Sequence, residues 1–179
     1  MKTSLLLAIS LTLAAAAFGQ EPALKKQELT TIKGSICLPE DWFLKEETDD
    51  GVTIYQISRE KAEKAGAPFT TGLILTVTPK VTERAEMKPS KYALDLLPSG
   101  ADDGARGMVK TEEGPLQCFR AEYAIEGDPE PITVITIAKA NDGTGTLYFL
   151  TWQSPASEAA ALKDLREKIL ASFTPDPAF

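Results

Sequence analysis

The segment Gly72 to Thr78, GLILTVT, constrains the fold of this chain more than any other stretch. Its length and its apolar and β-branched residues are typical of a strand, and Pro79 ends it. Apolar side chains occupy both of its alternating faces, whereas a strand with one face in water is apolar on the other face alone. The sequence therefore predicts a sheet whose central strand is covered on both sides.

Most of the remaining chain consists of alternating segments separated by turn residues. Further strands are predicted at residues 32–38, 52–57, 107–112, 116–126, 132–139 and 146–153. Asp49-Asp50-Gly51 and Asn141-Asp142-Gly143 are hairpin signals, because Asn, Asp and Gly tolerate positive φ. The neighbouring strands are therefore expected to pair in antiparallel fashion.

Two helices complete the pattern. The first is predicted within residues 82–97, most firmly from Pro89 onward, and residues 101–107 are expected to form a loop. The second helix follows the last strand, where apolar residues recur at helical spacing: Leu162, Leu165, Ile169 and Phe173. Strands joined by hairpins with two main helices predict an α+β domain with an antiparallel sheet of about six or seven strands.

Ser154 lies where the last strand gives way to this helix, in the segment FLTWQSP. Pro155 suits the first helical position, and a serine directly before it suits the N-cap. We expect Ser154 to be the structural N-cap of the last helix rather than a nucleophile, since the chain has no histidine to activate it.

The N-terminus has the features of a secretory signal peptide. Lys2 precedes an apolar stretch from Leu5 to Ala17, and small residues then precede a predicted cleavage site near Gly19-Gln20. The stretch is too short for a membrane span, and no cysteine follows it to carry a lipid anchor. Residues 1–19 therefore predict a periplasmic or secreted protein.

The rest of the chain is expected to form one acidic domain. Residues 20–30 are charged and lack a clear period, so they are expected to be a leader, with a single domain at 31–179. The formal net charge is −7, and it becomes −8 once Lys2 is removed with the signal peptide. This charge disfavours binding to nucleic acid and to anionic lipid surfaces.

Cys37 and Cys118 are the two cysteines of the chain. In an oxidising compartment they are candidates for one disulfide bond. The alternative is two separate buried thiols that behave as small apolar residues. Sequence spacing does not decide between these alternatives, because a disulfide depends on the distance between the two residues in space.

The absence of histidine limits the chemistry that the chain can perform. It excludes a Ser-His-acid triad, a Cys-His dyad and any zinc site that contains histidine. Ser58 and Lys61 match an S-x-x-K spacing, for which a charged surface turn is the favoured interpretation. Acidic residues are plentiful, as at 126, 128 and 130, and solvated turns explain them better than an ion site. No catalytic residue, metal site or cofactor is predicted.

The two tryptophans are candidates for a ligand platform or for core packing. Trp152 continues the alternation of Tyr148 and Leu150 on one strand face, so core packing is favoured for it. Trp42 follows a turn signal, and the sequence does not decide whether it is a ligand platform or a core residue.

Several segments together resemble the PsbP-like family, in order along nearly the whole mature chain. They are ICLPEDWF (36–43), GLILTVTP (72–79), YALDLL (92–97), GPLQCFRAEYAIEG (114–127) and LYFLTWQSPASEAAALKDLREKILASF (147–173). The resemblance implies an α/β/α sandwich with helices on both faces of a central antiparallel sheet. It also implies no shared active site, since known members act mainly by binding other proteins.

These observations favour an exported, non-enzymatic binding or accessory domain that engages a protein or an envelope component. One alternative is a hydrolase that uses carboxylates on an envelope polysaccharide, which would need an acid-lined cleft. Another is a small-ligand carrier, which would need a deep apolar cavity.

Overall fold

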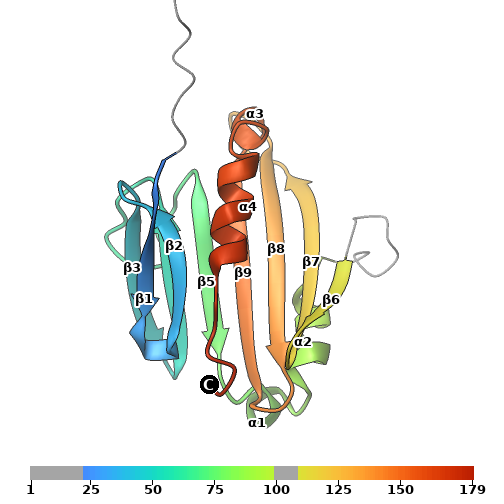
Figure 1. Cartoon of the computed structure of the whole chain (residues 1–179). Coiled ribbons are helices and arrows are strands. Elements are labelled where there is room, and N and C mark those ends of the chain that lie inside the picture. The colour runs from blue at the N-terminus through green and yellow to red at the C-terminus, as the bar shows by residue number, and fades with distance from the viewer. Residues whose placement is uncertain (1–21, 99–108) are drawn as a thin grey trace, which may run out of the picture.

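One antiparallel sheet of seven strands organises the computed structural model, which describes residues 22–98 and 109–179 (Figure 1). The strands are β3 (Phe43–Asp49), β4 (Val52–Ser58), β5 (Gly72–Thr78), β6 (Val109–Glu113), β7 (Leu116–Ile125), β8 (Ile132–Asn141) and β9 (Thr146–Pro155). Their spatial order is β3-β4-β5-β9-β8-β7-β6. The predicted strands and both hairpins are confirmed, whereas the predicted signal peptide and the loop at 101–107 lie outside the described residues.

A separate two-stranded ribbon lies over one side of this sheet. It consists of β1 (Leu24–Leu29) and β2 (Gly34–Pro39), joined by the short helix η1 (Thr30–Ile32). The expectation that residues 20–30 form a leader outside the domain is therefore wrong for β1. Its own sequence carries no period, and it becomes a strand because each of its residues pairs with one of β2.

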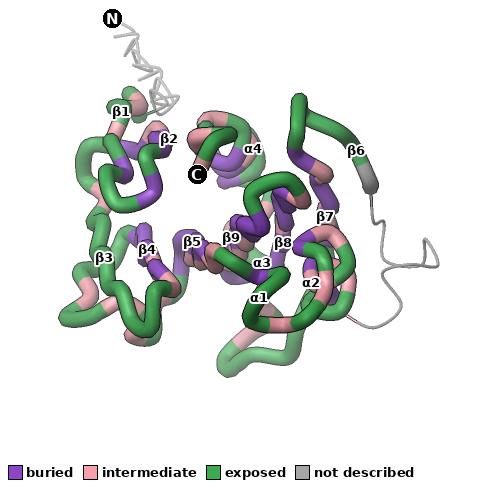
Figure 2. The backbone as a smooth tube through the Cα atoms, turned by 90° about the horizontal axis from the view of Figure 1, so that it is seen from below, coloured by how far each residue is buried: buried purple, intermediate pink, exposed green. Residues whose placement is uncertain are grey.

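Helices cover both faces of the sheet. One face carries α4 (Lys163–Ser172) beside the β1–β2 ribbon, and the other carries α1 (Val81–Ala85) and α2 (Pro89–Leu96) (Figure 2). The short helix α3 (Ala156–Ala159) lies at the end of β9. The expected sandwich is confirmed, with the ribbon as an addition to the α4 layer. Within the described part of the chain, no helix is long and apolar enough to cross a membrane.

The larger hydrophobic core lies between the sheet, the ribbon and α4. β5 contributes Leu73, Leu75 and Val77 to it, all with 0% exposure. Ile74, on the opposite face of β5, is half-buried, because α2 packs mainly against β8 and β9. The strand is thus covered on both sides as predicted, but more completely beneath the ribbon and α4.

Trp152 belongs to this core, as its alternation predicted. Its exposure is 0%, and its ring stacks on Trp42 with centroids 5.7 Å apart. Trp42 is half-buried against the same core. Both tryptophans are therefore packing residues.

Candidate binding groove

The edge of the sheet beyond α4 is not covered by a second layer. Seven strands spaced about 4.8 Å apart place the outer strands about 29 Å from each other. The ribbon and one helix, each about 10 Å wide, cover about 20 Å of that width. The strands on the far side of α4, β7 and β6, are left at the border of this layer (Figure 1).

A groove of about 730 Å³ occupies this border, between α4 and the outer strands. Its floor and outer wall come from β6, β7, β8 and the β6–β7 turn: Thr111, Glu113, Pro115, Leu116, Cys118, Phe119, Arg120, Ile137 and Lys139. Its other wall comes from α4 and the C-terminal tail: Glu167, Leu170, Ala171, Phe173, Thr174, Pro175 and Pro177. Most of these residues are apolar, and the volume lies in the range of small-molecule sites.

Lys139 is the buried cation of the groove. Its position on β8 faces α4, next to Cys118 on β7 and Tyr148 on β9, and its exposure is 6%. Its Nζ donates a hydrogen bond to Glu113 Oε2 at 2.7 Å and lies 5.9 Å from the centre of the Phe173 ring. A buried ammonium is stable only where charge and hydrogen bonds compensate its lost water, and these two neighbours supply part of that compensation.

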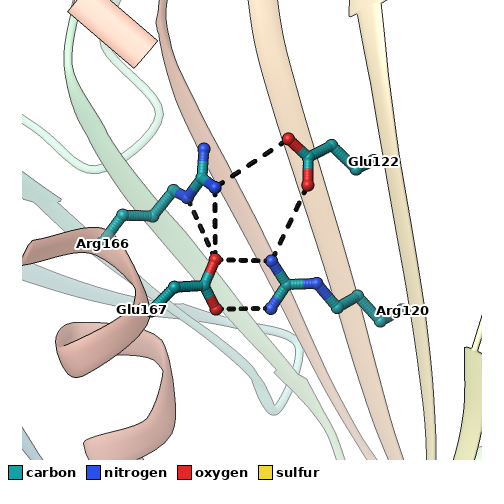
Figure 3. Close-up of polar contacts among 4 residues, drawn as sticks. All are labelled: Arg120, Glu122, Arg166 and Glu167. Carbon is teal, nitrogen blue, oxygen red and sulfur yellow. Dashed lines mark hydrogen bonds and ion pairs between the residues drawn. The ribbon is translucent and has the colours of Figure 1, made fainter. Parts of the chain in front are cut away.

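A second charged cluster joins β7 to α4 and contributes Arg120 and Glu167 to the lining of the groove. It consists of Arg120, Glu122, Arg166 and Glu167 (Figure 3). Arg120 donates to both carboxylate oxygens of Glu167, at 2.8 and 2.7 Å. Arg166, only 4% exposed, donates to Glu167 Oε1 at 3.2 and 3.3 Å and lies 3.8 Å from Glu122. The hydrogen bonds from Arg120 hold the pKa of Glu167 below its ordinary value. Positive and negative charges balance within the cluster.

Cys118 lies on the floor of the groove, 5% exposed. Burial, with a smaller contribution from the negative charge of Glu113, raises the pKa of its thiol to about 11. A nucleophilic cysteine needs a lowered pKa, so Cys118 acts here as a small apolar residue.

The candidate disulfide between Cys37 and Cys118 is not formed, and both residues are free thiols in the described structure. Cys37 lies on β2, where its backbone N–H donates to Ser172 Oγ on α4 at 2.8 Å. Cys118 lies on β7, at the far side of α4 (Figure 1). The two cysteines belong to different sheets, and a helix separates them.

Ser154 is not the N-cap of a helix. β9 continues through it to Pro155, because β8 extends far enough for Thr133 to pair with Ser154 and Ile132 with Pro155. The Ser154 hydroxyl is fully buried and has no hydrogen-bond partner within the part of the chain that the structure describes. The prediction that Ser154 is an N-cap was wrong because it placed the end of this strand at residue 153, whereas β9 ends at Pro155.

Glu130, from the β7–β8 connection, closes the start of α3 instead. Its carboxylate accepts hydrogen bonds from the backbone N–H and the hydroxyl of Ser157, both at 2.9 Å. Glu130 therefore has a structural role rather than a place in an ion site. No group of three or more Cys, Asp or Glu residues suited to a metal occurs among the described residues.

The Ser58–Lys61 pair also has a structural explanation. Ser58 is buried, and its hydroxyl donates to the carbonyl of Glu60 at 2.7 Å. Lys61 is exposed on the connection after β4. The surface-turn interpretation therefore holds for Lys61, whereas Ser58 is a buried residue at the end of β4 whose hydroxyl already donates a hydrogen bond.

Sequence reasoning did not identify the residues of the groove, although two signals for them were present. Lys139 follows Ile135 and Ile137 on the same face of β8, so it is a charge at an inward-facing position. Arg166 falls between Leu162 and Ile169 within the apolar stripe of α4. A charged residue that interrupts a buried pattern indicates a partner in another element. The partner of Lys139 is Glu113 on β6, and the partner of Arg166 is Glu122 on β7, 3.8 Å away.

No protein-family model and no curated protein matches the sequence. Solved structures do match. Cyanobacterial PsbP from a Synechocystis species aligns with a TM-score of 0.54 at 11% identity, over 92% of this chain and 99% of that one. A protein from Bacteroides thetaiotaomicron aligns with a TM-score of 0.51 at 12% identity, over 85% of this chain. This chain spans about half the length of the Bacteroides protein, 48%.

The Ran-binding protein Mog1p of Saccharomyces cerevisiae aligns with a TM-score of 0.48 at 12% identity, over 86% of this chain and 96% of that one. The chain has the PsbP-like fold, as the resemblance in its sequence implied. At these identities the shared property is the fold alone.

Proposed function

We propose that this protein is an exported domain that acts by binding rather than by catalysis, and that the groove beside α4 is its binding site. The observation that carries the proposal is an apolar groove of about 730 Å³ whose charged residues are already paired with one another. Binding sites for small molecules and for parts of larger molecules have this composition. The predicted signal peptide at residues 1–19 supports export to the periplasm or beyond.

The carboxylates of the groove are poorly suited to hydrolysis. Glu113 is bound to the ammonium of Lys139, and Glu167 is bound to Arg120 and Arg166. A general acid in a glycosidase has a raised pKa, whereas these contacts lower the pKa of Glu167. The groove therefore supports the binding role over the hydrolase that the sequence left open.

Filling the groove tests the proposal. Ala171 is exposed on α4 and lines the groove, so Ala171→Trp is expected to obstruct it without entering the core. Ala160→Trp, at the exposed end of α3, is the matched control. Each form is isolated from the envelope of producing cells and examined by native mass spectrometry for a bound component.

A component that remains with the wild type and with Ala160→Trp, but is lost from Ala171→Trp, would support the groove as the binding site. Equal retention by all three forms would place binding elsewhere. Turnover of an envelope polysaccharide that survives in Ala160→Trp and is lost in Glu167→Gln would contradict the non-enzymatic role.

A further inference from the structure

The ammonium of Lys139 has more donors than the described structure uses. A lysine carries three N–H donors. Within the described residues, Lys139 has one hydrogen-bond acceptor, Glu113, and one aromatic neighbour, Phe173. Because Lys139 is 6% exposed and lines the groove, water has little access to the unused donors. An oxygen acceptor on an occupant of the groove would complete the site.

The walls of the groove suit an occupant without backbone amides. Pro115, Pro175 and Pro177 have no N–H to donate. The floor strands β7 and β8 already pair with each other along their length. A bound peptide would therefore replace few of the hydrogen bonds that its amides make to water, which is costly, whereas an alkyl chain has none to lose.

The charges around Lys139 allow an oxygen of the occupant to approach. Glu113 lies on the edge strand β6, and its side chain is 54% exposed, so it can turn toward water when another acceptor takes its place. The remaining charged pair of the groove, Arg120 and Glu167, is neutral as a whole. The groove thus offers the unused donors of one buried ammonium within a largely apolar channel.

We infer that the groove takes a single acyl chain, with the carboxylate or carbonyl oxygen at its polar end bound by Lys139. This inference rests on the proposed function, since it assigns a ligand class to the same groove. The chain lies against Leu116, Ile137, Leu170 and Phe173, and its oxygen accepts from the free donors of Lys139. A free fatty acid and an acyl ester share this chemistry.

Titration calorimetry with amphiphiles of equal chain length, below their micelle-forming concentrations, tests the assignment. The wild type is expected to bind dodecanoate and monododecanoylglycerol at least tenfold more tightly than dodecyltrimethylammonium, which has a cationic end. Dodecanoate should bind about tenfold more tightly than decanoate, because each buried CH₂ strengthens binding several-fold. The tighter of the two oxygen-bearing probes identifies the source as free acid or ester.

Lys139→Met keeps the apolar stem and removes the donors, so it should weaken dodecanoate binding at least tenfold and abolish the preference over the ammonium probe. Lys139→Arg should retain the preference. Lys163→Met, at the exposed start of α4, is the control and should leave binding unchanged. Equal affinity of the wild type for the carboxylate and the ammonium probe would overturn the inference, as would unchanged binding in a folded Lys139→Met protein.

A measurement on the wild type alone covers the case in which Lys139→Met does not fold. Cys118 lies in the groove, so bound dodecanoate should slow its alkylation at least fivefold, and dodecyltrimethylammonium should not. Equal rates with both probes would overturn the inference.

The two proposals fail separately. If no amphiphile binds while Ala171→Trp still loses the component carried from cells, the ligand class is wrong and the binding groove stands. If the component carried from cells is a polypeptide, the ligand class is likewise wrong and the binding groove stands. If Ala171→Trp retains everything that the wild type binds, the proposed function itself is wrong.

Discussion

Acidic side chains from distant turns hold the starts of two helices in this protein. Asp142, in the β8–β9 turn, accepts from the backbone N–H and the hydroxyl of Ser90 at the start of α2, at 2.9 and 2.8 Å. Glu130 does the same for Ser157 of α3. Neither helix has a side-chain cap from its own N-cap residue in the described structure. The first N–H groups of a helix need acceptors, and here the sheet turns supply them.

Two substitutions test whether Glu130, rather than the predicted Ser154, caps the start of α3. Glu130→Ala should lower the free energy of unfolding by about 1 kcal/mol through the lost cap. Ser154→Ala removes a buried hydroxyl without a partner in the described chain, so the free energy of unfolding should stay unchanged or rise by about 1 kcal/mol. Denaturant titration measures both values, with the exposed Glu126→Ala as control. A loss in Ser154→Ala as large as that in Glu130→Ala would contradict the assignment.

The thiol of Cys118 should be nearly inert in the folded protein. Its pKa of about 11, against an ordinary 9.0, lowers the thiolate fraction at pH 8 about 100-fold, and burial restricts access further. Alkylation at pH 8, followed by peptide mass spectrometry, should be at least tenfold slower in the native than in the denatured protein. Unfolding without reductant should expose two free thiols, and a single bridged species would contradict the structure.

At the level of elements, α4 is attached to the sheet by charge as well as by its apolar stripe. Leu162, Ile169 and Phe173 pack into the core, while Glu167 binds Arg120 on β7. Arg166 adds a buried guanidinium to the same contact. The paired carboxylate fixes the helix beside β7, and this position defines one wall of the groove.

This attachment should weaken in acid. The pKa of Glu167 is lowered in the folded protein, so its contribution to stability is present above its ordinary pKa of 4.5 and is lost as the pH falls through the folded value. Glu167→Gln should cost about 1 kcal/mol at pH 7, because the pair is partly exposed. The difference in melting temperature from the wild type should shrink toward pH 3. The exposed Glu112→Gln is the control, and a pH-independent difference would contradict this role of Glu167.

At the scale of the whole molecule, the C-terminal tail connects the end of α4 to the sheet. Its carbonyls accept hydrogen bonds from three buried side chains: Tyr148 to Asp176 at 3.2 Å, Asn141 to Pro177 at 2.9 Å and Thr146 to Phe179 at 3.0 Å. Pro175 and Pro177 of the same tail line the groove. The tail thus contributes to stability and to the binding site together.

Removal of residues 175–179 should therefore destabilise the fold. Three hydrogen bonds at about 1 kcal/mol each predict a loss of about 3 kcal/mol in the free energy of unfolding. Denaturant titration measures it, and Ala178→Ser at an exposed position of the tail, which keeps the three backbone acceptors, serves as the control. A truncated protein as stable as the wild type would show that the tail is dispensable.

Local patterns in the sequence predicted most of the sheet. The alternation of apolar residues and the Asp-Gly and Asn-Asp-Gly turns located β4, β5 and the β8–β9 hairpin, because side-chain direction and turn geometry depend on neighbouring residues. The start of α2 at Pro89 was predicted for the same reason. The absence of histidine also limited the chemistry, since residue types are independent of the fold.

Features that depend on distant residues were decided by the tertiary structure alone. β1 is a strand only through its pairing with β2, and β9 continues through Ser154 only because β8 extends beside it. Lys139 and Glu113 meet only when β6, β7 and β8 are assembled. The groove arises because one ribbon and one helix do not cover seven strands. Its existence depends on widths and packing in three dimensions, which no local pattern in the chain contains.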